Sequence, residues 1–483
     1  MKLPTFPSFA LVLGAIMIPT SGSAQETLDR TIRPLPQPVP KVDLPDIQKA
    51  KLSNGLNIWL VEHHELPLVA LNLVIQSGSD HDPLNMPGLA SMTADVIDEG
   101  TETRDALQIS DELQFIGANF GVQSTADGSF MTLGTLTKHL DKALSVYTDV
   151  LTNPTFPQKE FDRLKKQRLT SLLQQKDQPS TIASLAFNHI LYGSNHPYGN
   201  NSSGTEASLN SMTREDLEKF YTSYYRPNNA TLIIVGDATL KDITRKLEKA
   251  LNDWKAAPIP TVTNPTPTAV DQRRVYLIDK PGAAQSEIRI GYPALARNSP
   301  DFFPVTIMNR MLGGQFTSRL NLNLREKHGF TYGARSGFSF SKQPGPFTAS
   351  AGVTTAKTDS SLREFFYEID KMHTTGLIAD ELAFAKKGLS GSFALSFETP
   401  SQVAGALQNV VLYNLPEDYY ERYLQNIDKI TLADVNQASK KYLDSSQMAV
   451  VVVGDLKVIK DDVQKLNLGE LVLCDVDGKK MTQ

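Results

Sequence analysis

The histidines of this chain are its most obvious candidates for metal chemistry. Eight are present: His63, His64, His81, His139, His189, His196, His328 and His373. A zinc site on a helix needs two histidines one turn apart, and the sequence contains no H-x-x-x-H or H-x-x-E-H pair. The densest cluster is Glu62-His63-His64-Glu65, but neighbouring residues on a strand point in different directions. This spacing favours a polar hairpin surface over a metal site.

A second candidate segment runs from Ser77 to Thr101. It begins with a polar, glycine-containing turn, passes through Pro87-Gly88-Leu89-Ala90 into a helix-patterned run, and stops at a Gly-Thr pair. Three acids, Asp95, Asp98 and Glu99, gather near the end of this run. The sequence leaves open whether they form solvated surface or face a cavity.

The order of residues in this segment resembles the active-site segment of the pitrilysin/insulinase-like (inverzincin) zinc peptidases, whose motif runs G-L-A-H-x-x-E-H and closes on G-T. In that family the two histidines bind zinc and the glutamate activates the attacking water. Here the three motif positions hold Ser91, Ala94 and Asp95. A hydroxyl, a methyl and one carboxylate cannot form a His2Glu zinc site. Ser91 also lacks the His and Asp partners of a catalytic triad, which argues against serine chemistry.

The family's third zinc ligand has no counterpart either. The resemblance places this ligand, a glutamate, on a later helix. The corresponding stretch, Arg163 to Lys176, contains no acid, and Thr170 and Ser171 occupy the expected neighbourhood. We therefore expect no metal ion and no other cofactor in this chain.

The second half of the chain carries a different signature, from Asn309 to Ser336. Its Gly313-Gly314 turn, Ser-Arg-Leu, Leu-Arg-Glu-Lys and following Gly and Tyr resemble the C-terminal half of the same family, in which Arg325 and Tyr332 fall on an Arg/Tyr pair. An arginine holds a peptide carbonyl or carboxylate through its fork of donors, and a phenol can donate to an oxyanion. Two other interpretations remain: Arg325 as an exposed charged helix end, and Tyr332 as a strand residue packed on its neighbours.

The chain also contains an internal repeat. The segment from Thr213 to Tyr224 resembles Thr431 to Tyr442, with Thr, Asp and Tyr residues matching at one constant offset. The Val-Gly-Asp triplet that ends a valine- and isoleucine-rich strand recurs at the same offset. Near the start of each half, Ile58 to Val61 resembles Val275 to Ile278. Matches at both ends of each half indicate a duplication.

Each half has the same order of elements: hairpin strands, then helices, then a closing Val-rich strand. This order predicts an α+β fold with two homologous α/β-roll-like halves, antiparallel-rich sheets and helices packed on one face. Asn54-Gly55 predicts a hairpin turn, and helices are expected over 159–175 and 213–224. The predicted boundaries are 51–255 for the N-terminal half, 256–272 for a Pro/Thr-rich linker and 273–483 for the C-terminal half.

The N-terminus predicts export. Lys2 precedes an apolar run and small residues that end at Ala24, the pattern of a cleavable signal peptide over residues 1–24. The apolar run is too short to anchor the chain in a bilayer. A Pro-rich extended arm is expected over residues 25–50. The single cysteine, Cys474, excludes an internal disulfide. Together these features predict a periplasmic location.

Composition narrows the choice of function. The chain has 483 residues, more than one compact core accommodates, and its net charge of -5 argues against nucleic-acid binding. No membrane partner is expected after signal cleavage.

The resemblance implies a zinc-free subunit of a periplasmic heterodimeric zinc metalloendopeptidase. A homologous H-x-x-E-H subunit would carry the zinc, while this chain would form the chamber that binds peptide substrates and supply Arg325 and Tyr332. The alternative is a purely structural or peptide-binding scaffold subunit. The missing ligands argue against a zinc peptidase that works alone.

Overall fold

The structure is a computed structural model that describes residues 46–267 and 270–481. The predicted signal peptide and most of the predicted Pro-rich arm lie outside the described residues. Within the described ranges, every helix is too short or too polar to cross a bilayer.

The first half is built on a six-stranded sheet. Its strands are β1 (Gln48–Lys51), β2 (Asn57–Glu62), β3 (Leu68–Ile75), β4 (Asn119–Ser124), β5 (Ser129–Leu136) and β6 (Ala230–Gly236), in the order β1-β2-β6-β3-β5-β4. Neighbouring strands are antiparallel except for the parallel pair β2 and β6. The predicted Asn54-Gly55 turn joins β1 to β2, with Gly55 at a φ of 98° that glycine adopts readily.

The helices of the first half are α1 (Leu89–Val96), α2 (Ala106–Phe115), α3 (Leu140–Thr152), α4 (Gln158–Gln175), α5 (Pro179–Tyr192), α6 (Glu206–Ser211), α7 (Arg214–Tyr224) and α8 (Leu240–Ala250). Four of these helices, α2, α6, α7 and α8, begin with a side-chain cap. Helix α4 matches the helix predicted over 159–175. Helix α7 matches the second predicted helix, and Thr213 with Asp216 forms its capping box, which satisfies donors at the helix start.

The second half repeats this plan. Its strands are β7 (Arg274–Asp279), β8 (Gln285–Leu295), β9 (Arg335–Phe338), β10 (Gly345–Thr354), β11 (Ala449–Gly454) and β12 (Glu470–Cys474), in the order β12-β7-β11-β8-β10-β9. Its helices are α9 (Phe302–Leu312), α10 (Arg319–Asn321), α11 (Thr358–Thr375), α12 (Ala379–Ala394), α13 (Pro400–Leu412), α14 (Tyr423–Lys429), α15 (Leu432–Tyr442) and α16 (Leu456–Lys465). A π-helical turn, Leu322–Lys327, follows α10 directly.

The two sheets have equivalent topologies. Replacing β2, β6, β3, β5 and β4 by β7, β11, β8, β10 and β9 converts one strand order into the other. The sheets differ at one edge, where β1 runs antiparallel to β2 but β12 runs parallel to β7. The duplication and the α+β class are therefore confirmed. Between α8 and β7, the described residues form neither helix nor strand.

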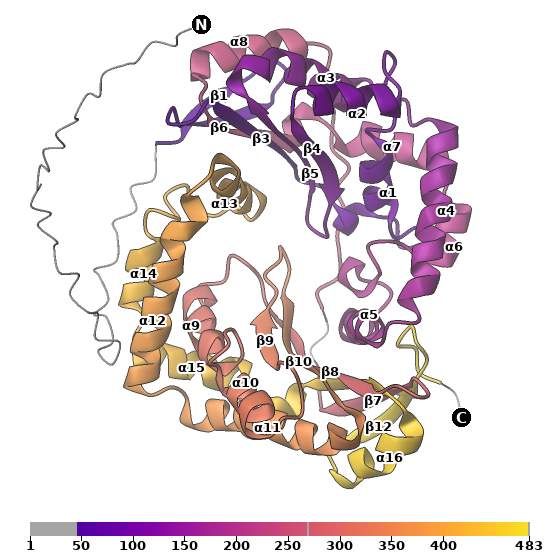
Figure 1. The fold of residues 1–483 in the computed structure, drawn as a ribbon, viewed down its shortest axis with the longest axis vertical. Helices are drawn as coiled ribbons and strands as arrows, with labels where there is room; N and C mark the ends of the chain where they lie inside the picture. The colour runs from indigo at the N-terminus through magenta and orange to yellow at the C-terminus, as the bar shows by residue number, and fades with distance from the viewer. Residues whose placement is uncertain (1–45, 268–269, 482–483) are drawn as a thin grey trace, which may run out of the picture. The chain divides into compact units, whose positions relative to one another are not determined.

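Each half lends a helix to the other half's sheet (Figure 1). Helix α13, from the second half, packs Leu407 and Leu412 against Val74 and Ile233 of the first sheet. Helix α5, from the first half, packs against β8 and β11 of the second sheet, with Phe187 in the shared core. The helices of each half therefore pack on one face of its sheet, as expected, and the exchanged helix covers part of the other face.

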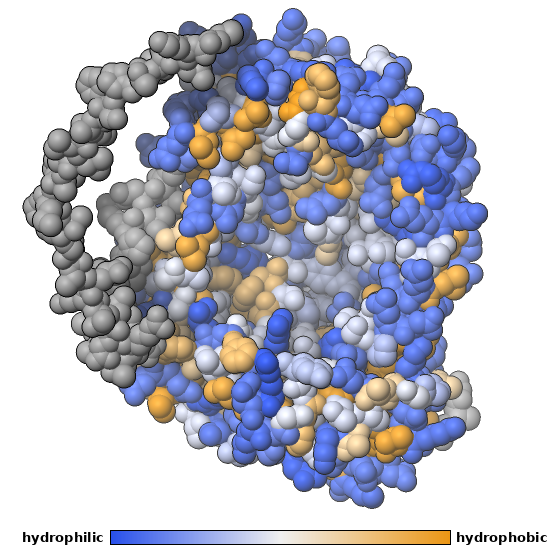
Figure 2. Space-filling model, in the orientation of Figure 1, coloured by the Kyte–Doolittle hydropathy of each residue, from blue (hydrophilic) through white to orange (hydrophobic). Residues whose placement is uncertain are grey.

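The hairpin between β9 and β10 also joins the halves. The backbone N–H of Lys342 donates to Asp127 Oδ2 at 2.9 Å, and Gln343 Oε1 lies 2.9 Å from His196 Nε2. Asp127 is buried, and it accepts hydrogen bonds from Tyr198 of the first half and Lys342 of the second. On the face shown in Figure 2, apolar side chains are interspersed among polar ones.

Candidate functional site

Helix α1 carries the three motif positions, and the turn before it is sterically constrained. Gly88 has a φ of 90°, and a Cβ atom there would lie 2.6 Å from the backbone nitrogen of Gly204. The carboxylate of Asp82 accepts hydrogen bonds from the backbone N–H groups of Gly88 at 2.8 Å and Ala90 at 2.7 Å. Burial raises the pKa of Asp82 to about 7. The helix start is therefore fixed by local contacts that involve no metal.

The three motif positions differ in their surroundings. Ala94 is buried, Ser91 is partly buried and Asp95 is exposed. Arg168 of α4 reaches both polar residues: one Nη atom donates to Ser91 Oγ at 3.1 Å and forms an ion pair with Asp95. The Arg168 side chain is 12% exposed. A guanidinium therefore lies against the positions where the family's zinc ligands stand.

This arrangement does not fit a zinc ion. Arginine carries five donors and no lone pair for a metal, and its positive charge repels a cation at short range. The second Nη atom of Arg168 is buried and has no hydrogen-bond partner among the described residues. Because Arg168 engages both Ser91 and Asp95, neither side chain is free to act as a ligand.

Sequence reasoning missed Arg168 and named Ser171 instead. The structure places Ser171 on the exposed side of α4, while Thr170 donates to the Lys166 carbonyl within the same helix. Arg168 lies about one turn before Ser171, inside the stretch that was noted only for its lack of acids. Its position in the sequence was the available signal. An arginine close to the place where the family carries an acidic ligand gives that place a positive charge instead of a negative one.

The acids at the end of the motif segment have separate roles. Glu99 accepts a hydrogen bond from Arg163 of α4 at 2.7 Å, so Arg163 and Arg168 hold two acids of this segment. Asp98 has no ion-pair partner among the described residues. Burial, with the nearby Glu99 and Asp95 carboxylates adding to it, raises the pKa of Asp98 to about 6. Glu99 and Asp95 therefore fasten the motif segment to α4.

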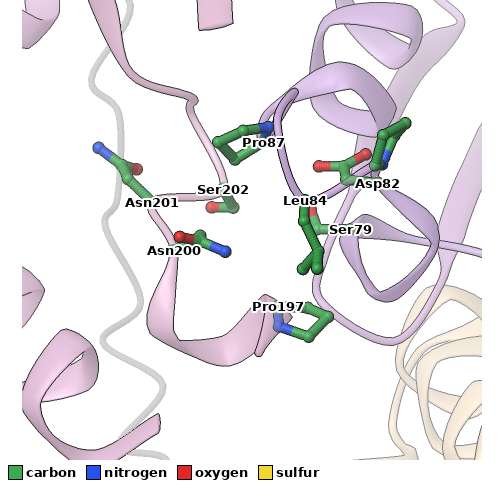
Figure 3. A pocket seen from close by; sticks show the side chains of 9 residues that line it. Ser79, Asp82, Leu84, Pro87, Pro197, Asn200, Asn201 and Ser202 are labelled. Atoms are coloured by element: carbon green, nitrogen blue, oxygen red, sulfur yellow. The ribbon is translucent and has the colours of Figure 1, made fainter. Parts of the chain in front are cut away.

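A small pocket lies beside the start of α1 (Figure 3). Ser79, Asp82, Leu84 and Pro87 line one side of it, and the segment from Pro197 to Ser202 lines the other. Leu84 and Pro87 also line a cavity of about 840 Å³ that continues between α4, α5 and α6. The turn before the motif helix therefore borders a space large enough for side chains of a bound peptide.

His64 is held by two carboxylates. Its Nδ1 lies 2.8 Å from Asp237 Oδ1 and its Nε2 lies 3.0 Å from Glu62 Oε2. Hydrogen bonds with Asp237 and Glu62 raise the pKa of His64, which favours an imidazolium with both nitrogens protonated. An imidazolium has no lone pair for a metal. Among the described residues, no group of three His, Cys, Asp or Glu side chains is arranged to hold a metal ion.

Arg325 lies on the π-helical turn of the second half. Its guanidinium sits 4.8 Å from the centre of the Phe316 ring, a cation–π distance. Its Nε lies 3.3 Å from Glu326 Oε1, and both side chains are well exposed. A π-turn often marks a functional site, but the exposed Arg325 and Glu326 side chains at its end also fit the exposed charged helix end considered from the sequence. Gly313 allows this region to close, because a Cβ there would lie 2.2 Å from Ser336 N.

Tyr332 projects into solvent. The residue is 88% exposed. The interpretation of Tyr332 as a packed strand residue is therefore wrong. The structure brings Ser91 and Asp95 together through Arg168, while no hydrogen bond or ion pair among the described residues links them to Arg325 or Tyr332.

Comparisons with known proteins identify the family. The profile described as "Insulinase (Peptidase family M16)" matches residues 58–205, and the profile described as "Peptidase M16 inactive domain" matches residues 211–389. This chain belongs to the M16 peptidase family. It is a member without the family's zinc-binding motif, because Ser91, Ala94 and Asp95 stand at the ligand and base positions.

Relatives of this M16 chain carry contrasting descriptions. A "Non-peptidase homolog YmxG" of Helicobacter pylori is 25% identical, over 82% of this chain and 91% of the relative. The "Zinc protease PqqE" of the same species is 23% identical, over 84% and 93%. Among solved structures, a "peptidase M16 inactive domain" from Pseudomonas fluorescens is 28% identical and superposes with a TM-score of 0.80, over 85% of this chain and 98% of that one.

Proposed function

We propose that this chain is the zinc-free subunit of a periplasmic heterodimeric zinc metalloendopeptidase. It forms part of the chamber that binds peptide substrates and supplies Arg325 and Tyr332 to the active site of a homologous H-x-x-E-H subunit. The observation that carries the proposal is a contrast between the halves. Arg168 contacts the residues at the motif positions of the first half, while in the second half Tyr332 is exposed and Arg325 pairs with the exposed Glu326 and the Phe316 ring.

The chemistry of the pair suits a supporting role. Zinc on the partner would polarise the peptide carbonyl and activate the attacking water. In this chain, the Arg325 guanidinium can donate hydrogen bonds to a substrate carbonyl or carboxylate. The Tyr332 hydroxyl can donate a hydrogen bond to the oxyanion that forms at the attacked carbonyl. Neither role requires a metal ligand from this chain.

The relatives support a division of labour. One species, Helicobacter pylori, has a relative described as a non-peptidase and another described as a zinc protease, and each aligns with more than four-fifths of this chain. Such a pair is what a heterodimer of one catalytic and one zinc-free subunit requires. The predicted signal peptide over residues 1–24 supports a periplasmic location for this member.

The proposal is tested by purifying the mature chain alone, the homologous H-x-x-E-H subunit alone, and the two together. We expect a stable complex that holds one zinc per pair and cleaves a quenched fluorescent peptide, while the isolated chain has neither zinc nor activity. Stoichiometric zinc and chelator-sensitive cleavage by the isolated chain would overturn the proposal. Failure of the two chains to associate would overturn it equally.

A peptide-binding scaffold is the second candidate, and one observation favours it. Strand β4 forms an edge of the first sheet and contacts α1, so its free backbone groups lie beside the motif helix. An exposed strand edge can bind an extended peptide without catalysis. A scaffold would bind peptides whether or not Arg325 and Tyr332 are intact, whereas a catalytic-support subunit needs both for turnover.

A further inference from the structure

Two asparagines sit beneath the surface that presents Arg325. Asn321 ends α10 and Asn323 lies on the π-helical turn; they are 4% and 5% exposed. A buried side-chain amide destabilises the folded protein unless hydrogen bonds satisfy it. Their partners therefore show which segments each amide holds in place.

The Asn321 amide hydrogen-bonds to two backbone segments, one that precedes it in the sequence and one that follows it. Its Nδ2 donates to the Phe316 carbonyl at 2.8 Å, and its Oδ1 accepts from the backbone N–H of Ala334 at 3.2 Å. Phe316 is 59% exposed and its ring lies under the Arg325 guanidinium. Ala334 follows Tyr332 by two residues. One buried side chain thus ties the backbone on either side of the Arg/Tyr pair.

The segment around Tyr332 is held at a second point as well. Thr331 Oγ1 accepts from the Gly333 N–H at 3.0 Å and donates to the Gly352 carbonyl at 2.7 Å. With Ala334 fixed by Asn321, little freedom is left for the backbone that carries Tyr332. The side chain of Tyr332 itself remains free, so its position depends on these backbone ties.

The Asn323 amide fixes the π-helical turn to α11. Its Nδ2 donates to Glu364 Oε2 at 2.9 Å and to Glu368 Oε1 at 2.8 Å. These glutamates lie one turn apart, where two like charges repel, and the shared amide offsets that repulsion. Asn323 therefore fixes the position, relative to α11, of the turn that carries Arg325.

We propose that Asn321 is a positioning residue: it aligns Phe316, Arg325 and Tyr332 as one peptide-binding surface. This inference rests on the proposed function. The Phe316 ring supplies an apolar surface and a cation–π contact for the Arg325 guanidinium. Arg325 and Tyr332 supply hydrogen-bond donors. A displacement of about 1 Å at such a surface is enough to lower turnover by roughly a hundredfold.

The test uses Asn321→Asp in the complete complex with the zinc subunit. An ionised aspartate can still accept from Ala334 but cannot donate to Phe316, and its oxygen would repel that carbonyl. We expect kcat/KM for peptide cleavage to fall about tenfold or more. Because Asn321 acts partly through Arg325, Asn321→Asp combined with Arg325→Ala should lower kcat/KM by clearly less than the product of the two single losses. If the two losses multiply in full, the inference is overturned.

Asn229→Asp is the matched control. Asn229 likewise donates through its amide to a backbone carbonyl, that of Tyr224 at 2.9 Å, but it lies in the first half. We expect this control to leave kcat/KM within about twofold and to combine with Arg325→Ala additively. An equal loss from both Asp variants would mean that Asn321 is only structural and would overturn the inference.

Hydrogen exchange of the isolated chain gives a readout that does not need the partner. Asn321→Asp should speed amide exchange in residues 313–318 and 331–334 while leaving β11 protected. Unchanged exchange there would overturn the inference. If Arg325→Ala leaves cleavage unchanged, the proposed function and this inference both fail; if Arg325→Ala lowers cleavage and Asn321→Asp does not, only this inference fails.

Discussion

Arg168 donates to Ser91 Oγ at 3.1 Å from the same nitrogen that forms an ion pair with Asp95. In the M16 family these two positions of α1 belong to zinc ligands. Here a side chain from α4 supplies the positive charge, and the two helices are joined by a hydrogen-bonded ion pair. The Arg168 contacts therefore hold the motif segment against α4.

This relationship predicts a stabilising role for Arg168. Arg168→Met should lower the free energy of unfolding by about 1 kcal/mol, because Asp95 and Ser91 lose a charged donor but Asp95 is partly solvated. Urea unfolding of both proteins measures the difference. Arg245→Met is the control, since Arg245 pairs with Asp242 on an exposed helix surface, and it should change stability by less than about 0.5 kcal/mol. Equal effects of the two variants would contradict the prediction.

Arg168 should also obstruct any attempt to rebuild the metal site. The triple variant Ser91→His, Ala94→Glu, Asp95→His restores the motif but leaves a guanidinium beside it. Zinc should bind at least about tenfold more tightly when Arg168→Glu is added, because a repelling cation is removed and a carboxylate ligand is gained. Competition with a zinc-sensitive dye gives both affinities. Equal affinities in the triple and quadruple variants would show that Arg168 does not face the site.

Asp98 predicts a pH dependence of stability. Its pKa is raised by burial to about 6, above the value of about 3.9 expected in the unfolded chain. The unfolded state therefore releases this proton first, so stability falls as the pH rises from about 4 to about 6. Asp98→Asn removes this loss and should raise the free energy of unfolding at pH 7 by about 1–2 kcal/mol, with a much smaller gain at pH 4.

Urea unfolding of the wild type and Asp98→Asn at both pH values provides the measurement. Glu99→Gln is a useful comparison, because Glu99 is paired with Arg163 and its substitution should not stabilise the protein at pH 7. A gain for Asp98→Asn that is the same at pH 4 and pH 7 would rule out titration of this carboxyl as the cause.

The exchanged helices α5 and α13 predict that the two halves unfold together. Leu407 of α13 is 6% exposed and packs on the first sheet. Leu407→Ala should lower stability by about 2–4 kcal/mol. The loss should appear in one transition, with tryptophan fluorescence, which reports Trp59 and Trp254 of the first half, coinciding with circular dichroism of the whole chain. Separate transitions for the two signals would show that the halves are independent.

The sequence predicted elements that depend on local chemistry. A helix was predicted over 213–224, and the repeat matched this segment to Thr431–Tyr442; Thr213 and Thr431 both form capping boxes at helix starts, because a cap is satisfied within four residues. The repeat of these signals predicted the duplicated topology. Neither the exchange of α5 and α13 nor the contact of Arg168 with Asp95 could be predicted in this way. Both depend on how distant segments pack, and an apolar helix face does not specify which sheet covers it.

The same distinction holds for the second half. The matching Ser-Arg-Leu and Leu-Arg-Glu-Lys segments drew attention to Arg325 and Tyr332, but spacing alone did not decide whether they were exposed. The π-helical turn and the Asn321 ties arise from three-dimensional contacts with Phe316 and Ala334. A single asparagine in a sequence does not show which backbone groups its side chain will bond.

The last prediction concerns the proposed catalytic support. In the complex with the zinc subunit, Arg325→Ala and Tyr332→Phe should each lower kcat by roughly tenfold to a thousandfold, as loss of one transition-state donor does in other enzymes. Tyr332→Phe removes a single hydroxyl from an exposed side chain, so it should leave the stability of the chain and its affinity for the partner unchanged. A fall in kcat with little change in KM would place the lost interaction in the transition state.

Tyr367→Phe is the matched control for that measurement. Tyr367 is an exposed tyrosine on α11 of the same half, and its substitution should leave kcat within about twofold of the wild type. If Tyr332→Phe behaves like this control and Arg325→Ala also leaves turnover unchanged, then the pair takes no part in catalysis. Peptide binding that persists in both variants would then favour the scaffold, because the edge of β4 beside α1 offers backbone donors and acceptors that neither substitution touches.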